Sequence, residues 1–330
     1  MPVLQSSQYT APWWLPGAHI QSISPRLLRR VEKPAYTRRR IETPDNDFLD
    51  LDLAHNPSGD GKLLILSHGL EGHSDREYIW GMAGAFFREG WSTLAWNFRS
   101  CGQALNRQSR LYHCADLDDI RTVIAFALAQ GYTRLLLSGF SMGGNITLRY
   151  LGVLAGNLPK EVLGGFAFSV PCDLASCSRK IGKGFNKIYS LIFLKSLKKK
   201  VRQKSAAFPE LYATAKLRDI KTLRDFDNTY TAPVHGFLSA EDYYAKASCV
   251  SVLERIDRPT LLVNALNDPL LGPECFPYAA ARENAFLYFE TPGEGGHVGF
   301  ASKSARSRDF TGSLYWSEKR AVEFAREHFY

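Results

Sequence analysis

One serine in the sequence, Ser141, lies in the run Gly139-Phe140-Ser141-Met142-Gly143, directly after an apolar segment. In such a G-x-S-x-G pattern the serine occupies a sharp turn between a strand and a helix. The chain closes so tightly there that residues 139 and 143 have no room for a side chain. The N-terminus of the following helix favours negative charge beside the serine. The pattern therefore predicts that Ser141 is a nucleophile.

A serine nucleophile needs a base, and the base needs an acid that orients it. After a serine on this kind of turn, the acid and then the base follow along the chain. His297 lies in a glycine-rich loop directly after the last expected strand, so we predict that it is the base. Asp268, in LNDPL, follows the preceding strand and is the predicted acid. Asp173, at the end of an earlier strand, is the alternative acid.

Two backbone N–H groups are needed to stabilise the negative oxygen that forms when a serine attacks a carbonyl. One comes from the residue after the serine, Met142, and the other from Leu70, in the SHGLEG loop that follows an earlier strand. His68 is expected to shape this loop, and a role as a second base is the less favoured alternative. His113 and Asp118 match an H-x4-D pattern of acyltransferases, but the match is loose, and the start of a helix is the favoured explanation of the acidic residue.

Strand-like and helix-like segments alternate from about residue 36 to 170 and again after residue 250. This alternation predicts an α/β fold in which a mostly parallel central sheet carries helices on both faces. Residues 172–250 contain no buried strand, so we predict a helical cap inserted between late strands. The predicted core is then residues 1–171, with an N-terminal extension of about 1–35, and residues 251–330, which carry the acid and the base.

The chain has 330 residues, of which 45% are hydrophobic and 22% charged, as in a globular protein with a large core. Its first residues lack the basic and apolar regions of a secretory leader, and no apolar run approaches the about 18 residues of a membrane span. Its six cysteines form no CxxC pair, so we expect a cytoplasmic protein with reduced thiols. Metal-ligand spacings and nucleotide-binding motifs are absent, so we expect neither a metal nor a cofactor.

The net charge of +8 is concentrated in one segment, because Arg179 to Lys204 contains ten Lys or Arg and no Asp or Glu. The favoured interpretation is a cap helix with a solvated basic face. The alternative is a transient contact of this segment with an anionic membrane surface, which would make a cytoplasmic protein peripheral to a membrane. Nucleic acid is not an expected partner, because the segment has no recognised binding motif and no stacking aromatic residues among its lysines.

Several stretches along nearly the whole chain resemble the YheT-like branch of the α/β-hydrolase superfamily, a group of esterases with relatives among membrane-associated lipases and acyltransferases. These stretches are PWWLPGAHIQSISP, RRRIETPDNDFLDLD, SHGLEG, NFRSCG, SGFSMGGN, YYAKAS, RPTLLVNALNDP and GGHVGF. The resemblance implies an α/β-hydrolase fold and places the nucleophile, acid and base on Ser141, Asp268 and His297. Asn267 departs from the acidic residue that relatives often carry beside the acid.

The residues and the resemblance together predict a serine carboxylesterase that acts on an acyl ester through an acyl-enzyme. Two alternatives stay open: transfer of the acyl group to an alcohol by the same residues, and binding of a small apolar ligand without turnover. An acyl pocket is expected beneath an apolar roof, because one run of the cap is apolar on nearly every side. This run contains Phe185, Ile188, Tyr189, Leu191, Ile192 and Phe193. Such a pocket favours short- to medium-chain acyl esters.

Overall fold

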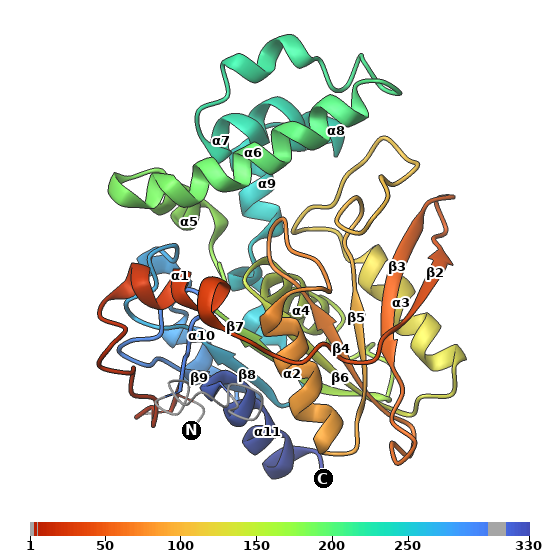
Figure 1. Ribbon diagram of the computed structural model, residues 1–330, viewed down its shortest axis with the longest axis vertical. Coiled ribbons are helices and arrows are strands. Elements are labelled where there is room, and N and C mark those ends of the chain that lie inside the picture. The colour runs from red at the N-terminus through yellow and green to blue at the C-terminus, as the bar shows by residue number, and fades with distance from the viewer. Residues whose placement is uncertain (1–2, 5, 303–314) are drawn as a thin grey trace.

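The computed structural model describes residues 3–4, 6–302 and 315–330, which form a nine-stranded sheet with helices on both faces (Figure 1). The strand order is β1-β9-β8-β7-β6-β4-β5-β3-β2. The strands are β1 (Val3–Leu4), β2 (Thr37–Glu42), β3 (Phe48–Ala54), β4 (Lys62–Ser67), β5 (Ser92–Trp96), β6 (Arg134–Phe140), β7 (Val162–Phe168), β8 (Thr260–Val263) and β9 (Leu287–Glu290). Neighbouring strands are parallel except in the pairs β2–β3 and β3–β5. The predicted fold class is therefore confirmed.

Helices connect the parallel strands and cover both faces of the sheet. Those of the core are α2 (Glu77–Arg88), α3 (Asp118–Ala129), α4 (Met142–Val153), α10 (Tyr278–Glu283) and α11 (Trp316–His328). The central strand β4 accordingly has no polar face. Leu63 and Ile65 point to the side of α3 and α4, whereas Leu64 and Leu66 point to the side of α2 and α11.

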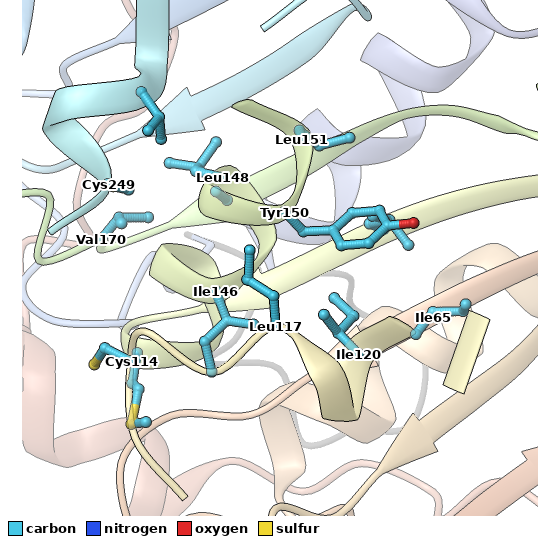
Figure 2. Packing of buried hydrophobic residues seen from close by; sticks show 14 of the residues in the cluster. Ile65, Cys114, Leu117, Ile120, Ile146, Leu148, Tyr150, Leu151, Val170 and Cys249 are labelled. Carbon is cyan, nitrogen blue, oxygen red and sulfur yellow. The ribbon is translucent and has the colours of Figure 1, made fainter. Parts of the chain in front are cut away.

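The packing around α4 fixes the helix that begins directly after Ser141. Every residue of α4 from Met142 to Gly152 is buried. Figure 2 shows Ile146 and Leu148 of this helix among the buried side chains of neighbouring segments. A helix enclosed on all sides has little freedom to shift, so the turn that carries Ser141 is held in place from below.

The segment between β7 and β8 is helical, and most of it lies at the top of Figure 1, over the carboxyl ends of the strands, whereas residues 249–255 pack against α4 in the core. Its elements are α5 (Leu174–Ile181), α6 (Lys187–Lys204), α7 (Leu223–Phe226), α8 (Ala232–Val234) and α9 (Ala240–Ala247), with the short helical turns η1 (Gly184–Asn186), η2 (Thr214–Arg218), η3 (Asp227–Thr231) and η4 (Cys249–Arg255). Leu194, Leu197 and Val201 of α6 pack with Phe226 and Tyr230 in a cluster of their own. The predicted helical insert is confirmed, and it has a small core separate from that of the sheet.

The N-terminal extension, for which the sequence predicted no element, contributes the helix α1 (Ala18–Leu28) and the edge strand β1. In Figure 1 α1 is the red helix beside α5 and the N-terminal end of α6. The residues of α1 that are buried are polar, Gln21 and Ser24. This helix therefore does not pack on the core through an apolar face.

Candidate active site

Ser141 lies between β6 and α4, on a turn where its own φ is 52°. A residue with a side chain keeps such a φ only where the surrounding structure imposes it. A Cβ atom added to Gly139 would collide with the backbone of Gly143. One added to Gly143 would collide with the carbonyl oxygens of Ser67 and His68. The turn thus tolerates no side chain at either glycine position.

The structure brings Ser141, His297 and Asp268 into one hydrogen-bonded chain. The distance from Ser141 Oγ to His297 Nε2 is 2.9 Å, and that from His297 Nδ1 to Asp268 Oδ2 is 2.8 Å. Asp268 is completely buried, and its other carboxylate oxygen accepts the N–H of Leu270 at 2.8 Å. A carboxylate at Nδ1 holds the ring proton on that nitrogen, so Nε2 faces the serine hydroxyl as an acceptor. The geometry suits proton transfer from Ser141 to His297.

The alternative acid, Asp173, lies at the start of α5 and serves a different purpose. Its carboxylate accepts the backbone N–H of Ser176 at 2.7 Å and caps that helix. His297 bonds to Asp268 instead.

The two residues predicted to supply backbone N–H donors, Leu70 and Met142, line the same cavity as Ser141. Met142 is the first residue of α4, so its N–H has no acceptor within the helix. The loop after β4 passes directly beside the serine, since a Cβ atom added to Gly69 would lie 3.3 Å from the Cβ of Ser141. Leu70 follows on that loop and lines the same cavity as Ser141 and Met142. This arrangement could hold a negatively charged oxygen.

His68 has both ring nitrogens engaged in the loop itself. Nε2 accepts the N–H of Phe98 at 3.1 Å, which leaves the proton on Nδ1 to be donated to the carbonyl of Gly69 at 2.7 Å. Burial lowers the pKa of His68 to about 3. The expectation that this histidine shapes the loop is confirmed, and neither nitrogen is free to act as a second base.

Glu71, the residue after Leu70, ties this loop to the cap. Its carboxylate accepts hydrogen bonds from Tyr112 Oη at 2.5 Å, from Lys200 Nζ at 2.6 Å and from the hydroxyl of Ser196. The side chains of Glu71 and Lys200 are only 5% and 9% exposed. The backbone of Glu71 has a φ of 54°, and its N–H bonds to Tyr112 Oη at 3.0 Å. A buried ion pair therefore connects α6 with the residue next to a candidate N–H donor.

The H-x4-D pattern does not join its two members. His113 packs against the ring of His235 in a tilted arrangement, with 4.2 Å between ring centroids, and lines the cavity. Asp118 is exposed at the start of α3 and pairs with Arg121 at 3.3 Å. The start of a helix, favoured from the sequence, thus accounts for this aspartate.

A cavity of about 150 Å³ extends from Ser141 and His297 between the core and the cap. Much of its lining is apolar and includes Leu70, Leu174, Ile181, Leu197, Phe226 and Leu271. The roof differs from the one expected. Of the apolar run of the cap only Phe193 lines the cavity, whereas Phe185, Ile188, Leu191 and Ile192 are exposed. The expectation that this run is covered on all sides is wrong, because the N-terminal end of α6 extends beyond the core.

The basic segment of the cap also differs from the solvated face expected. Four of its lysines donate hydrogen bonds to protein oxygens, Lys180, Lys198, Lys200 and Lys204. Lys180 Nζ binds the carbonyls of Asp268 and Leu271 at 2.8 and 2.6 Å. The cap therefore binds the loop of Asp268 as well as the loop of Glu71. The interpretation as a solvated face is correct only for the remaining basic residues.

The helix α1 supports the loop of His297 through polar groups that the sequence did not single out. Ser22 Oγ accepts the N–H of His297 at 2.8 Å. Gln21 Oε1 accepts the N–H of Gly295 and the side-chain amide of Asn267, both at 2.9 Å. Asn267 in turn accepts the N–H of Gly296 at 2.9 Å. The only signal in the sequence was that Gln21 and Ser22 lie in PWWLPGAHIQSISP, one of the stretches that carry the family resemblance. The resemblance did not indicate which groups these side chains contact.

Within residues 3–4, 6–302 and 315–330, no group of three or more His, Cys, Asp or Glu side chains is arranged to hold a metal ion. In the same part of the chain, no helix is both long and apolar enough to cross a membrane.

Residues 62–303, which include Ser141, Asp268 and His297, match the family model of the alpha/beta hydrolase fold. The chain belongs to the α/β-hydrolase family. Within it, this α/β-hydrolase is 33% identical over 289 residues to the Escherichia coli (strain K12) protein named "Putative esterase YheT". The match covers 86% of this chain and 84% of that relative, so the chain belongs with the YheT-like members.

Two further relatives of this α/β-hydrolase extend the comparison. The mouse protein named "Phospholipase ABHD3" is 27% identical over 314 residues, which cover 91% of this chain and 74% of that protein. Among solved structures, the esterase Pf2001 of Pyrococcus furiosus superposes with a TM-score of 0.58 over 99% of this chain and 100% of its own. Its sequence is 18% identical, so that likeness shows the α/β-hydrolase fold alone.

Proposed function

We propose that this α/β-hydrolase is a serine carboxylesterase that hydrolyses short- to medium-chain acyl esters. The observation that carries the proposal is the hydrogen-bonded chain from Ser141 Oγ through His297 to Asp268, with distances of 2.9 and 2.8 Å. A pure binding protein has no need of this arrangement at the mouth of an apolar cavity. Relatives named as a putative esterase and as a phospholipase also support ester hydrolysis.

In the proposed mechanism Ser141 Oγ attacks the ester carbonyl while His297 Nε2 takes its proton. Asp268 keeps the imidazole oriented and stabilises its positive charge. The backbone N–H groups of Leu70 and Met142 stabilise the oxyanion that develops on the carbonyl oxygen. His297 then returns the proton to the departing alcohol, and the same steps with water in place of Ser141 release the acid.

The cavity supports the proposed acyl length. Its volume is about 150 Å³, and an apolar cavity of about that volume accommodates a benzene-sized group. An acyl chain of about six carbons is comparable in size to such a group. Each of its methylenes that is buried in the cavity contributes about 0.8 kcal/mol to binding. Longer chains would have to displace Phe193, Phe226 or other lining side chains. Acetate would leave the cavity largely unfilled.

The test is a series of p-nitrophenyl esters of increasing acyl length, with wild-type protein and Ser141→Ala. For the wild type we expect kcat/KM to rise from acetate to a maximum at short or medium acyl length. For Ser141→Ala we expect kcat to be lower than that of the wild type by about 10⁶. A steady fall from acetate onward would refute the acyl pocket, and equal rates for Ser141→Ala would refute the nucleophile. With ethanol present we expect free acid as the main product. Predominant ethyl ester would instead identify an acyltransferase.

A further inference from the structure

The helix α1 has its amphipathic character reversed, with apolar residues facing solvent. Ile20, Ile23 and Leu27 share one side of the helix and are 48%, 36% and 73% exposed. The opposite side carries Gln21 and Ser22, whose side chains bond to the loop of His297. Because the inner side is committed to these polar contacts, the apolar side has no protein surface to cover it in the described residues.

The turn η1 and the N-terminal end of α6 expose a second apolar stripe beside the first. Phe185, Ile188, Leu191 and Ile192 are between 42% and 61% exposed. His19 of α1 joins the two helices, because its ring lies 4.6 Å from that of Phe185 and its Nδ1 lies 3.1 Å from Tyr189 Oη. Figure 1 shows α1 beside this end of α6.

Together these side chains form one exposed region, which we call the α1/α6 apolar surface. Its members are Ile20, Ile23, Leu27, Leu28, Phe185, Ile188, Leu191 and Ile192. Isolated exposed leucines are ordinary on a soluble protein, but adjoining apolar faces of two helices mark a place where something binds.

Positive charge surrounds the α1/α6 apolar surface. Lys183 and Lys187 lie among its aromatic and aliphatic residues in the sequence, and Lys195 continues the exposed stripe of α6 one turn further on. These three lysines are exposed and form no ion pair within the residues that the structure describes. Arg26 of α1 and Arg30, which lies just after that helix, are exposed as well. The partner that fits is apolar in its interior and negatively charged at its surface.

We propose that the α1/α6 apolar surface docks this protein on an anionic phospholipid surface. Apolar side chains enter the boundary between headgroups and acyl chains, and the surrounding lysines and arginines contact the anionic headgroups. A second copy of the chain fits less well, because a symmetric dimer through this surface would bring the same basic residues of both copies together.

The docking surface adjoins the candidate active site, so the proposal also concerns how substrate arrives. α1 bonds directly to the loop of His297, and Phe193, next to Ile192, lines the cavity in front of Ser141. An ester held in a lipid layer would therefore lie close to the cavity. This last step rests on the proposed esterase function, whereas docking itself does not.

The experiment measures co-sedimentation of Ser141→Ala protein with vesicles of equal parts phosphatidylglycerol and phosphatidylcholine, and with vesicles of phosphatidylcholine alone. We expect binding to the anionic vesicles and much weaker binding to the neutral ones. Adding Ile188→Gln and Leu191→Gln should weaken binding by about tenfold or more. The matched control is Leu238→Gln, which replaces a leucine that is 92% exposed between α8 and α9, away from this surface. It should bind as the parent does.

Equal binding of the double variant and the parent would overturn the assignment of the surface, and so would absence of binding by the parent. A dimer in solution that the double variant abolishes would identify a second copy of the chain as the occupant and overturn the lipid assignment. Hydrolysis of a soluble p-nitrophenyl ester by the wild-type protein, measured beside vesicle binding by Ser141→Ala, separates the two proposals. If the wild type hydrolyses the ester and Ser141→Ala does not bind anionic vesicles, only the docking proposal fails. Vesicle binding by Ser141→Ala without any hydrolysis by the wild type contradicts the esterase alone.

Discussion

The ion pair between Glu71 and Lys200 should control catalysis through the loop that carries Leu70. Lys200→Met removes the ammonium that lies 2.6 Å from a carboxylate only 5% exposed, while the hydrogen bonds from Tyr112 and Ser196 remain. Breaking a buried pair from one side costs about 3–5 kcal/mol, because the remaining charge stays buried. We take the lower end, about 3 kcal/mol, since the carboxylate keeps two donors, and expect the melting temperature to fall by about 6–12 °C.

The catalytic effect of Lys200→Met should exceed what loss of stability explains. Glu71 is adjacent to Leu70, so a shift of this carboxylate should move the Leu70 N–H away from the position proposed for the oxyanion. Complete loss of one such donor lowers kcat by about 10²–10³, and a partial shift should lower it by about 10–100-fold with KM nearly unchanged. The assay is hydrolysis of a p-nitrophenyl ester well below the melting temperature. Lys200→Arg should recover part of the loss.

A matched control lies one helical turn further along α6. Lys204 is also buried, and its Nζ donates to the carbonyls of Asn106 and Gln108 rather than to the loop of Glu71. Lys204→Met should destabilise the protein by about 1–3 kcal/mol through the unsatisfied carbonyls, yet leave kcat within about threefold. If the two variants lose kcat equally, the ion pair only anchors the cap and the reasoning is refuted.

Three further predictions address the acid, the support from α1 and the buried histidines. Asp268→Asn should lower kcat by about 10⁴, whereas Asp173→Asn should lower it by less than about tenfold; comparable losses in ester hydrolysis would reassign the acid. Gln21→Ala should lower kcat by about tenfold with a smaller change in KM, and unchanged kinetics would show that α1 does not position the loop of His297. Burial lowers the pKa of His113 to about 3 and that of His235 to about 2, so both bind protons mainly in the unfolded state and the free energy of unfolding should fall as the pH drops below about 6.5. Replacing both histidines by glutamine should reduce the fall in the free energy of unfolding between pH 6.5 and 5 by about 2 kcal/mol per histidine, as measured by urea denaturation. An unaltered pH dependence of this free energy would contradict the burial argument.

The sequence was sufficient to locate the candidate triad, because each of its members is marked by signals that lie close to it along the chain. Ser141 needs a strand, a turn closed to side chains and a helix, and each has a signal within about ten residues of the serine. Asp268 and His297 follow successive strands, and parallel strands bring their carboxyl ends to one edge of the sheet. The alternation of strands and helices therefore predicted both the fold class and the meeting of these residues.

The features that escaped prediction depend on contacts between distant segments. Lys200 belongs to a run of basic residues, which favours solvent exposure, and its partner Glu71 lies 129 positions away. The apolar run of α6 was expected to be covered, because periodicity shows that a face is apolar and not whether anything packs on it. Gln21 and Ser22 lie in a short polar stretch whose purpose appears only once the loop of His297 is beside it.

The central claim, that Ser141 is an activated nucleophile, is tested most directly by a fluorophosphonate probe and mass spectrometry of the labelled peptide. The account predicts stoichiometric labelling on Ser141, lost in Ser141→Ala and strongly slowed in His297→Ala, because the hydroxyl is nucleophilic only beside its base. A folded wild-type protein that the probe leaves unlabelled, or labels at another residue, would contradict it.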